Sequence, residues 1–503
     1  MDAFLPALPL LVLITALVLK RGAVVSSLLG SAAVLAVIWL DRRYALDFAA
    51  ALSTDLPVVL ILTLSVALVI VPGQILNALL QASGTLAAIG ARIESLRLSR
   101  VKMASILILG VAPMLESLTG FGVSLFFTVP VLVRLFSLKK ALLLSLLSMN
   151  IMPWGTLALA TSVGAQLSGA PLRELAVMSS WTSFAVFPAL GLLIFAICRE
   201  KNSRSTPDLL YPLLAGGVLS CCLVFYNAFA TPELAGVCAG FTTAALALLA
   251  EILRRGPGLL AAAAAAGAGE TRGAQPLWRL LAPYLALIAL IGLSRIAAVN
   301  GALQRLFSLE SGGVQLFVFT SPGVFIFLTV LLMRAWSAAY RGHPGVFPGG
   351  VKRAAYPVAG IMLFVVFAQL HRASGLFEDL AARLVALSAS EITFAAPLLG
   401  MLSGYATGSN VGGNALFMTL QSDAGRHFEH ALAFAALQNS AAGHAVFLSL
   451  PIILLTLSIA AAGSGDAGRS RVHACQTWLI RRALLCAPLI YAALVIPFHL
   501  LIR

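Results

Sequence analysis

The sequence predicts an all-α polytopic membrane protein with about 12 transmembrane helices plus two re-entrant hairpins, arranged as an inverted-topology repeat with broken helices. Composition is the first reason. Of the 503 residues, 60% are hydrophobic and only 10% are charged, which is too little polar material to cover a soluble protein. The second reason is that apolar residues form runs of about 20, the length that spans a bilayer as a helix. Examples are 177–198, 209–229 and 234–253.

Charge and cysteine usage exclude several other classes. The net charge of +14 suggests nucleic acid at first sight, but the positive charges fall in loops, as in bacterial inner-membrane proteins. We therefore expect a multi-pass protein of the bacterial inner membrane, surrounded by membrane lipid, with no nucleic-acid partner. The six cysteines form no CxxC pair, so we expect no metal site, no disulfide framework and no cofactor.

The first apolar run, 4–19, is expected to be a retained helix. Asp2 precedes it, no Lys or Arg does, and no small-residue cleavage pattern follows. A secretory signal peptide would carry Lys or Arg before the apolar run and a small-residue cleavage site after it.

The basic loops predict the topology, because Lys and Arg concentrate on the cytoplasmic side. These loops are 92–102, 199–204, 254–279, 334–353 and 469–482. Placing all of them inside requires two apolar regions to enter the membrane and return to the same side. We therefore predict a re-entrant hairpin at 103–132, entering from the cytoplasm, and another at 391–421, entering from the exterior. Both chain ends then lie outside.

The two hairpin regions resemble each other, which indicates an internal repeat. The Thr-Gly pair at 119–120 recurs at 407–408, and Gly155 recurs as Gly443 at the same spacing. Each hairpin is followed by a crossing with a break in its middle, a pattern typical of secondary transporters. The predicted broken helices are 140–166, interrupted at 150–155, and 431–461, interrupted at 439–443.

A low-complexity stretch that includes the alanine run 261–266 separates the two halves. We expect residues 1–253 to form the first inverted half, 254–278 a cytoplasmic linker and 279–503 the second half. Because the half-repeats are expected to pack as one body, this boundary is structural and not functional.

Breaks in membrane helices point to a binding site. In hydrocarbon an unpaired backbone N–H or C=O is costly, so unwound backbone persists only against protein or a watery cavity. The N-terminal ends of half-helices present free N–H groups and a positive dipole, which suit a carboxylate. Four such features that meet near the midplane would form one anion site.

Two ionisable residues are candidates for proton coupling. Glu116 lies in an apolar stretch near the first hairpin tip, where a carboxylate costs about 2.5–3.5 kcal/mol and usually serves function. The alternative is a structural hydrogen bond that holds the hairpin. His444 lies in the second predicted break and could share a proton with Glu116, although a satisfied structural histidine is the alternative.

The candidate substrate-binding residues lie at the hairpin tips and the breaks, where glycines permit tight turns and short polar side chains can bind an anion. Close helix packing is the alternative for the glycines at 120 and 122, an exposed loop for 407–414, and helix capping for the two break asparagines. The candidates are Thr119, Gly120, Gly122, Asn150, Thr407, Gly408, Ser409, Asn410, Asn414 and Asn439.

At these same residues the sequence resembles the lactate permease family. The family's acidic residue followed by a GFG turn is similar to ESLTGFG at 116–122. Its TGSD stretch, followed by an N-x-LF-x-x-LQ pattern, is similar to TGSN at 407–410 and NALFMTLQ at 414–421. Asn150 and Pro153 resemble the family's Asn and Pro in the first broken helix. The resemblance implies proton-coupled uptake of lactate, glycolate or related 2-hydroxy acids, and a fold similar to the wider ion-transporter superfamily.

We therefore expect a secondary transporter for a small organic anion, most simply a lactate-type or glycolate-type monocarboxylate. H⁺ is the expected coupling ion, symport the expected mode and alternating access the expected mechanism. An enzyme is not expected, because no HExxH motif and no acidic pair occurs in an apolar segment. Open alternatives are a transporter of another anion, such as a dicarboxylate or sulfonate, with different coupling, a channel, and an intramembrane enzyme. A homodimer is left open as the assembly state.

Overall fold

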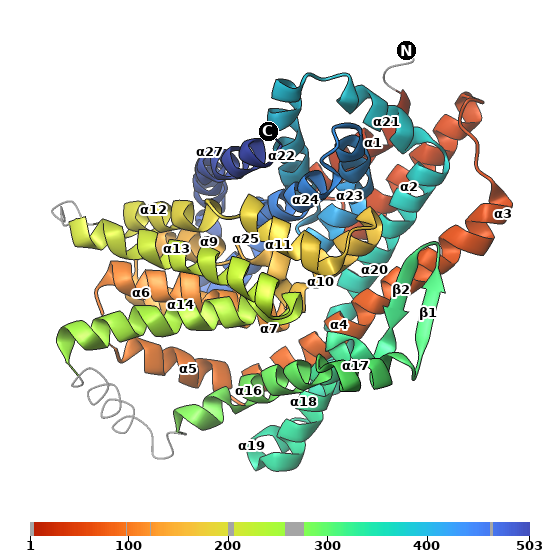
Figure 1. The fold of residues 1–503 in the computed structure, drawn as a ribbon. Helices are drawn as coiled ribbons and strands as arrows, with labels where there is room; N and C mark the ends of the chain where they lie inside the picture. Colours follow the sequence, from red (N-terminus) through yellow and green to blue (C-terminus); the bar gives the residue numbers. More distant parts are fainter. Residues whose placement is uncertain are drawn as a thin grey trace.

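The computed structural model describes residues 5–96, 98–120, 122–199, 206–256, 276–462 and 466–502. This part of the chain is almost entirely helical (Figure 1). Eight of its helices are long and apolar enough to cross a membrane, or up to 11 if each of three bent pairs is one span. The all-helical membrane class agrees with the prediction, whereas the number of crossings stays a prediction. Most of the predicted linker at 254–278 lies outside the described residues.

The first half consists of apolar helices interrupted mainly at Gly and Pro. Before the first hairpin come η1 (Leu5–Ala7), α1 (Leu8–Val18), α2 (Ala23–Leu40), α3 (Phe48–Ala50), η2 (Ala51–Asp55), α4 (Leu56–Ala82) and α5 (Thr85–Glu94). The hairpin comprises α6 (Arg100–Ile106), η3 (Leu107–Val111), α7 (Ala112–Thr119) and α8 (Val123–Leu135). The broken helix comprises α9 (Leu138–Leu147), η4 (Met152–Trp154) and α10 (Gly155–Ser168). The last helices are α11 (Leu172–Thr182), α12 (Val186–Cys198), α13 (Thr206–Phe229) and α14 (Pro232–Arg255).

The second half follows a similar order up to its broken helix, with two added strands, and has fewer helices after it. Before its hairpin come α16 (Leu277–Ser294), α17 (Ala297–Gln304), β1 (Ser308–Ser311), β2 (Val314–Phe317), η5 (Val318–Thr320), α18 (Pro322–Trp336), α19 (Ala338–Arg341), α20 (Val346–Ala373) and α21 (Leu376–Val385). Its hairpin comprises α22 (Ala389–Thr407) and α23 (Asn410–His427). Its broken helix comprises α24 (Ala431–Ala445), η6 (Val446–Leu448) and α25 (Leu450–Ala462). The last helices are α26 (Asp466–Ala474) and α27 (Gln476–Leu501).

One element departs from the all-α prediction. The strands β1 and β2 form a two-stranded antiparallel hairpin that packs beside α4 (Figure 1). Gly312 and Gly313 both have positive φ, at 55° and 78°, which a two-residue hairpin turn requires and which glycine adopts freely. The Gly-Gly pair is the sequence signal for this turn, but the surrounding apolar composition obscures it.

The two halves pack against each other reciprocally. The long helices α4 and α20 lie together in the centre. α2 packs on α20, while α18, its counterpart in the second half, packs on α4. The second part of each broken helix packs on the hairpin of the other half, α10 on α23 and α25 on α8. Such reciprocity is what two related repeats produce, and their opposite orientation in the membrane stays a prediction.

Glycines allow the closest helix approaches. A Cβ on Gly323 of α18 would lie 1.7 Å from the Leu68 carbonyl oxygen of α4. A Cβ on Gly404 of α22 would lie 1.9 Å from the Ala442 carbonyl oxygen of α24. Small residues at such contacts let helices associate by van der Waals packing where lipid provides no hydrophobic drive.

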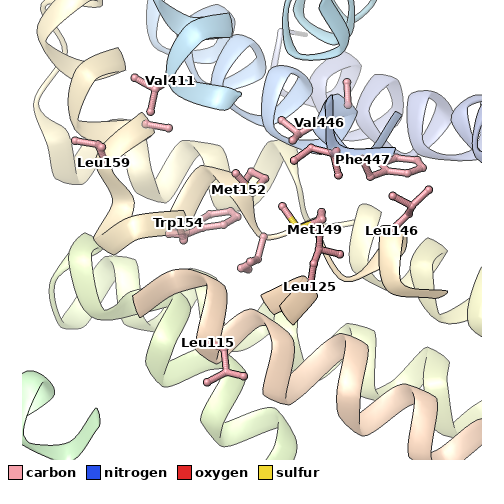
Figure 2. Close-up of a cluster of buried hydrophobic side chains, with 14 of the residues drawn as sticks. Leu115, Leu125, Leu146, Met149, Met152, Trp154, Leu159, Val411, Val446 and Phe447 are labelled. Carbon is pink, nitrogen blue, oxygen red and sulfur yellow. The ribbon is translucent and has the colours of Figure 1, made fainter. Parts of the chain in front are cut away.

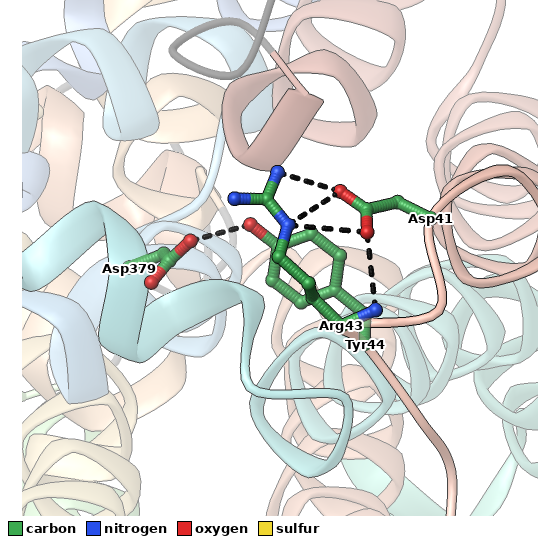
Figure 3. Close-up of polar contacts among 4 residues, drawn as sticks. All are labelled: Asp41, Arg43, Tyr44 and Asp379. Carbon is green, nitrogen blue, oxygen red and sulfur yellow. Dashed lines mark hydrogen bonds and ion pairs between the residues drawn. The ribbon is translucent and has the colours of Figure 1, made fainter.

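Polar contacts at one end of the molecule tie the halves together (Figure 3). Tyr44, in the loop after α2, donates a hydrogen bond to Asp379 of α21. Beside it, Arg43 forms an ion pair with Asp41 at 2.7 Å. Burial and the hydrogen bond to Asp379 raise the pKa of Tyr44 to about 12, so the phenol remains a donor at neutral pH. A short loop of the first half is thereby fastened to the second half.

The close approach of α22 to α24 can be tested with Gly404→Ala. The new methyl group meets backbone that cannot move aside, so overpacking should destabilise the protein by about 1–3 kcal/mol and lower its melting temperature in detergent. Gly217→Ala in α13 is the matched control, because no atom lies within 4 Å of its Cβ position. Equal melting temperatures for the two variants would contradict the observed packing.

Candidate functional site

The first hairpin tip is a turn that only glycines can make without strain. Gly120 and Gly122 have φ of 66° and 78°, in the left-handed region that disfavours other residues. A Cβ on Gly120 would also lie 1.5 Å from the Thr156 hydroxyl oxygen of the first broken helix. The tip is therefore built against the break of its own half. Phe121, between the two glycines, lies outside the described residues.

Glu116 holds this tip from inside. Its carboxylate accepts hydrogen bonds from the backbone N–H groups of Gly122 at 2.9 Å and Ser124 at 3.0 Å, and the side chain is fully buried. These are N–H groups at the start of α8, which have no partner within their own helix. These contacts are those of the structural alternative, in which hydrogen bonds from Glu116 hold the hairpin. Its role in proton coupling stays a prediction.

Thr119 also uses its polar groups close to the first tip. The Thr119 hydroxyl donates to the Leu115 carbonyl oxygen at 2.7 Å within α7. The Thr119 carbonyl oxygen lies 3.3 Å from the Cβ position of Gly73 in α4. The first tip thus faces one long central helix.

The second hairpin tip has the same form and faces the other long helix. Gly408 has φ of 65°, and Ser409 caps α23 by accepting from the Gly412 N–H at 3.3 Å. The Thr407 hydroxyl is 2.8 Å from both the Ser403 carbonyl oxygen of α22 and the Ser409 carbonyl oxygen of the tip, and can donate to either. A Cβ on Gly412 would lie 3.3 Å from the Phe364 ring of α20. The cluster at 407–414 is therefore a helix–turn–helix tip, and not the exposed loop considered as its alternative.

The first break lies where it was predicted, but Asn150 does not cap a helix N-terminus. Its side-chain NH₂ donates to the Leu147 carbonyl oxygen at 3.1 Å, at the C-terminal end of α9. The two parts of the helix meet at 56°. Beyond η4, the residues Thr156, Leu157 and Ala158 all have positive φ, between 51° and 57°. Three consecutive left-handed residues other than glycine are strained, and such strain concentrates at functional sites.

The second break does not lie at 439–443, so that prediction is wrong. α24 runs without interruption through Asn439 and His444, and the helix breaks only at η6 and Ser449. The physical reason is that Pro451 lacks an N–H and its ring cannot follow a preceding helical turn, so it favours a new helix start. Gly443 instead permits a close contact between the two halves, because a Cβ there would lie 2.6 Å from Pro153 of the first break.

Asn439 is the centre of a buried amide network that joins the two halves. Its side-chain oxygen accepts from the NH₂ groups of Asn410 at 3.2 Å and Asn414 at 2.9 Å. Its own NH₂ donates to Thr161 of α10 at 2.9 Å and Ser179 of α11 at 3.0 Å. All five side chains are buried. The structure thus brings together Asn410, Asn414 and Asn439, three of the predicted site residues.

His444 lies at the end of a chain of hydroxyl groups. Its Nε2 is 2.9 Å from the Ser183 hydroxyl, which donates to Ser440 at 2.9 Å, and Ser440 is 2.6 Å from Thr182. The backbone of Asn150 lies beside the imidazole. Among the described residues no hydrogen bond joins His444 to Glu116, so the two proton-coupling candidates lie in separate networks.

The ends of both breaks and both hairpins meet in an apolar cluster (Figure 2). Leu115 and Leu125 come from the first hairpin, and Met149, Met152 and Trp154 from the first break. The second half contributes Val411, Val446 and Phe447. Apolar side chains from both breaks and both hairpins therefore pack together here, and a shared anion site at this point stays a prediction.

A cavity of about 440 Å³ lies beside the second tip, and we call it the tip cavity. The tip residues 407–409 and the start of α25 form one wall, and α20 around Tyr356 forms another. Lys20 and Arg21, in the loop between α1 and α2, also line it. No acidic side chain does so among the residues that the structure describes.

Two helix N-termini meet at this cavity. α23 begins at the tip, and α25 begins after Ser449. The Ser449 hydroxyl is buried and has no hydrogen-bond partner within the described residues. It lies 3.2 Å from the Cβ position of Gly408. Helix N-termini and two cations together provide the electrostatics of an anion site.

Sequence reasoning missed several of these residues. Lys20 and Arg21 were hidden because a basic pair between two apolar runs is an ordinary cytoplasmic loop signal. Ser449 could have been found from the Ser-Leu-Pro pattern, in which a capping residue precedes a proline of the first helical turn. Thr161 and Ser179 carry no motif, because only the fold brings them to Asn439.

Comparisons with known proteins agree with the motifs. Residues 308–470 match the family model of L-lactate permease, a region that contains the second hairpin and its broken helix. An L-lactate permease of Streptococcus iniae is 21% identical over 355 residues, which cover 68% of this chain and 73% of that protein. L-lactate permeases of Salmonella typhi and Salmonella typhimurium are each 36% identical over 111 residues, which cover 21% of this chain and 19% of those proteins.

These relatives, together with the apolar helices, place the chain in the bacterial cell membrane as a multi-pass protein. The resemblance that its motifs indicate is thereby confirmed: the chain is similar to the L-lactate permeases.

Proposed function

We propose that this protein is a secondary transporter for a small organic anion, with a lactate-type or glycolate-type monocarboxylate as the simplest substrate. Its relatives are named L-lactate permease, which supports a transporter as the class of protein and a lactate-type acid as the class of substrate. The chain itself supports an anion, because the tip cavity has cations and helix N-termini and no acidic side chain among its described lining residues.

The tip cavity is the observation that carries this proposal. A carboxylate there would lie near the starts of two half-helices, the Ser409 hydroxyl group and the positive charges of Lys20 and Arg21. Each of these interactions favours negative charge, and the apolar walls strengthen them by lowering the local dielectric. The apolar lining, which includes Phe364 and Leu454, suits the hydrocarbon part of such an acid.

Alternating access follows from the arrangement of the hairpins. Each hairpin tip rests on a different long helix. The second part of each broken helix packs on the hairpin of the other half. A movement of the hairpins and broken helices against α4 and α20 would open one tip while closing the other. The predicted opposite orientation of the halves would make these openings face opposite sides of the membrane.

Proton coupling is proposed through Glu116. As a carboxylate, Glu116 accepts one hydrogen bond with each oxygen, from two backbone N–H groups. Protonation would turn one oxygen into a donor, remove one of these bonds and loosen the first tip. Proton binding and tip opening would then be linked. His444, with its chain of hydroxyl groups, is proposed as the second group that handles a proton.

Replacement of both cations, Lys20→Gln with Arg21→Gln, tests the anion site. In proteoliposomes the KM for lactate should rise about tenfold or more, equivalent to a loss of about 1.4 kcal/mol of binding free energy. Lys352→Gln is the matched control, because it removes an exposed lysine at the start of α20 that does not line the cavity. An unchanged KM in the double variant would remove these cations from the site.

A thermal-shift series on the purified protein distinguishes the substrate classes. Lactate and glycolate should raise the melting temperature, and this effect should be weakened in the Lys20 and Arg21 double variant. Stabilisation by dicarboxylates or sulfonates alone would support the anion site but contradict a monocarboxylate as the substrate.

Glu116→Gln tests proton coupling. The amide cannot release a proton, so lactate uptake should no longer depend on a pH gradient across the liposome membrane. Glu94→Gln, which removes an acidic residue paired with Arg134 in the same half, should keep the dependence. Full retention of the pH dependence by Glu116→Gln would exclude this residue from the coupling role.

A further inference from the structure

A second cavity occupies the place in the first half that corresponds to the tip cavity in the second. The tip cavity lies between α20, the loop before α2 and the start of α25. The second cavity lies between α4, the loop before α18 and the start of α10. These are the corresponding elements of the two halves. We call it the Arg295 cavity, and its volume is about 200 Å³.

Arg295 supplies positive charge to this cavity. It lies at the C-terminal end of α16, and its guanidinium donates to Glu233 of α14 at 2.8 Å and to the Thr320 carbonyl oxygen at 3.2 Å. The side chains of Arg295 and Glu233 are only 18% and 12% exposed. The Nε atom of Arg295 is buried and has no hydrogen-bond partner within the described residues. A buried guanidinium with a free N–H is a donor that awaits an acceptor.

Gln166 of α10 lines the same cavity and has a free acceptor. Its NH₂ group donates to the Gln315 carbonyl oxygen of β2 at 3.2 Å. Its side-chain oxygen is buried and has no partner in the described part of the chain. The hydrogen bond to Gln315 orients the amide, because it assigns the NH₂ group to the strand and leaves the oxygen free.

The two free groups match one ligand chemistry. A carboxylate accepts from the arginine N–H, and a hydroxyl group on the neighbouring carbon donates to the glutamine oxygen. The volume is below the about 300–1,000 Å³ of pockets for drug-sized ligands, so it suits a molecule with few heavy atoms. Ser162, which also lines the cavity, adds a hydroxyl group for the remaining carboxylate oxygen.

The Arg295 cavity also connects to the first hairpin tip. Leu157, in the left-handed turn of α10, lines the cavity. The preceding residue, Thr156, packs against Gly120 of the tip. A ligand that fills the cavity therefore presses on the segment against which the first tip closes.

We propose that the Arg295 cavity is a second binding site, specific for small 2-hydroxy carboxylates, with Arg295 binding the carboxylate and Gln166 the hydroxyl group. It serves as the access site on the side of the membrane opposite to the tip cavity. Its ligand class rests on the proposed function. Glu233 competes with the substrate for Arg295 and so limits affinity.

The charge part of this proposal is tested by transport in vesicles of both orientations. The double variant Arg295→Gln with Glu233→Gln avoids leaving one partner unpaired, so it should fold. It should raise the KM for lactate about tenfold from one side of the membrane only, whereas Glu233→Gln alone should lower it. Arg305→Gln, at an exposed arginine beyond α17, is the matched control and should change neither value. An unchanged KM in the double variant from both sides would overturn the site.

The hydroxyl part is tested by comparing lactate with propionate, which lacks the hydroxyl group. Gln166→Leu should abolish the preference for lactate on the affected side and leave the KM for propionate within a factor of about two. Retention of the full preference would overturn the role of Gln166.

Failure of the proposed function is distinguishable from failure of this site. If the unaltered protein transported no lactate in either orientation, the proposed function would fail. Lactate-dependent stabilisation against heating would then decide the site. Its weakening in both the Arg295→Gln, Glu233→Gln double variant and Gln166→Leu would support the Arg295 cavity, and unchanged stabilisation in both would overturn it.

Discussion

Unwound backbone inside an apolar core must find hydrogen-bond partners within the protein, and most of this structure follows from that need. The first hairpin turns at two glycines, which leaves the N–H groups at the start of α8 without helical partners. The buried carboxylate of Glu116 accepts two of them. At the first break the Pro153 carbonyl oxygen accepts the Thr161 hydroxyl at 2.6 Å. Each turn is therefore paired with one particular side chain, which explains why acidic and hydroxyl residues occur in such apolar segments.

The same need joins the two halves. The side-chain oxygen of Asn439 accepts hydrogen bonds from the second hairpin, and its NH₂ group donates to α10 and α11 of the first half. A buried amide that lost these partners would incur a large desolvation cost. The core bodies of the two halves are therefore held in one relative arrangement by neutral polar groups, while within the described residues no hydrogen bond joins the hairpin tips to α4 or α20. Movement is easiest at the packed surfaces, because sliding there breaks no buried hydrogen bond.

The distribution of charge separates the two cavities from the centre between them. Neutral amides, hydroxyl groups and apolar side chains fill the convergence of the breaks, apart from Glu116, whose carboxylate is bound by backbone. Cations lie at the cavities, Lys20 and Arg21 at one and Arg295 at the other. An anion would thus meet net positive charge at the tip cavity, where the helix N-termini extend that attraction inward, whereas Glu233 offsets the charge of Arg295 at the Arg295 cavity.

Several parts of this arrangement could be read from the sequence because their causes are local. Runs of apolar residues specify membrane helices, and the Thr-Gly pairs mark the hairpin tips because only glycine accepts the required φ. The first break was predictable from Pro153 and its neighbours. The second break was misplaced because Asn439 resembles a break residue in isolation, whereas in the fold its amide is satisfied within a continuous helix. The relevant local signal was Pro451.

The sequence by itself therefore determined the membrane class, the hairpin tips and the family resemblance, since each depends on residues that are close together along the chain. Only the tertiary structure decided which polar groups meet. Lys20 reaches the second tip, Thr161 reaches Asn439, and Arg295 shares a cavity with Gln166 because helices far apart in sequence pack side by side. Hydrogen bonds and charges act over a few ångströms, so their partners are set by packing, which no local pattern encodes.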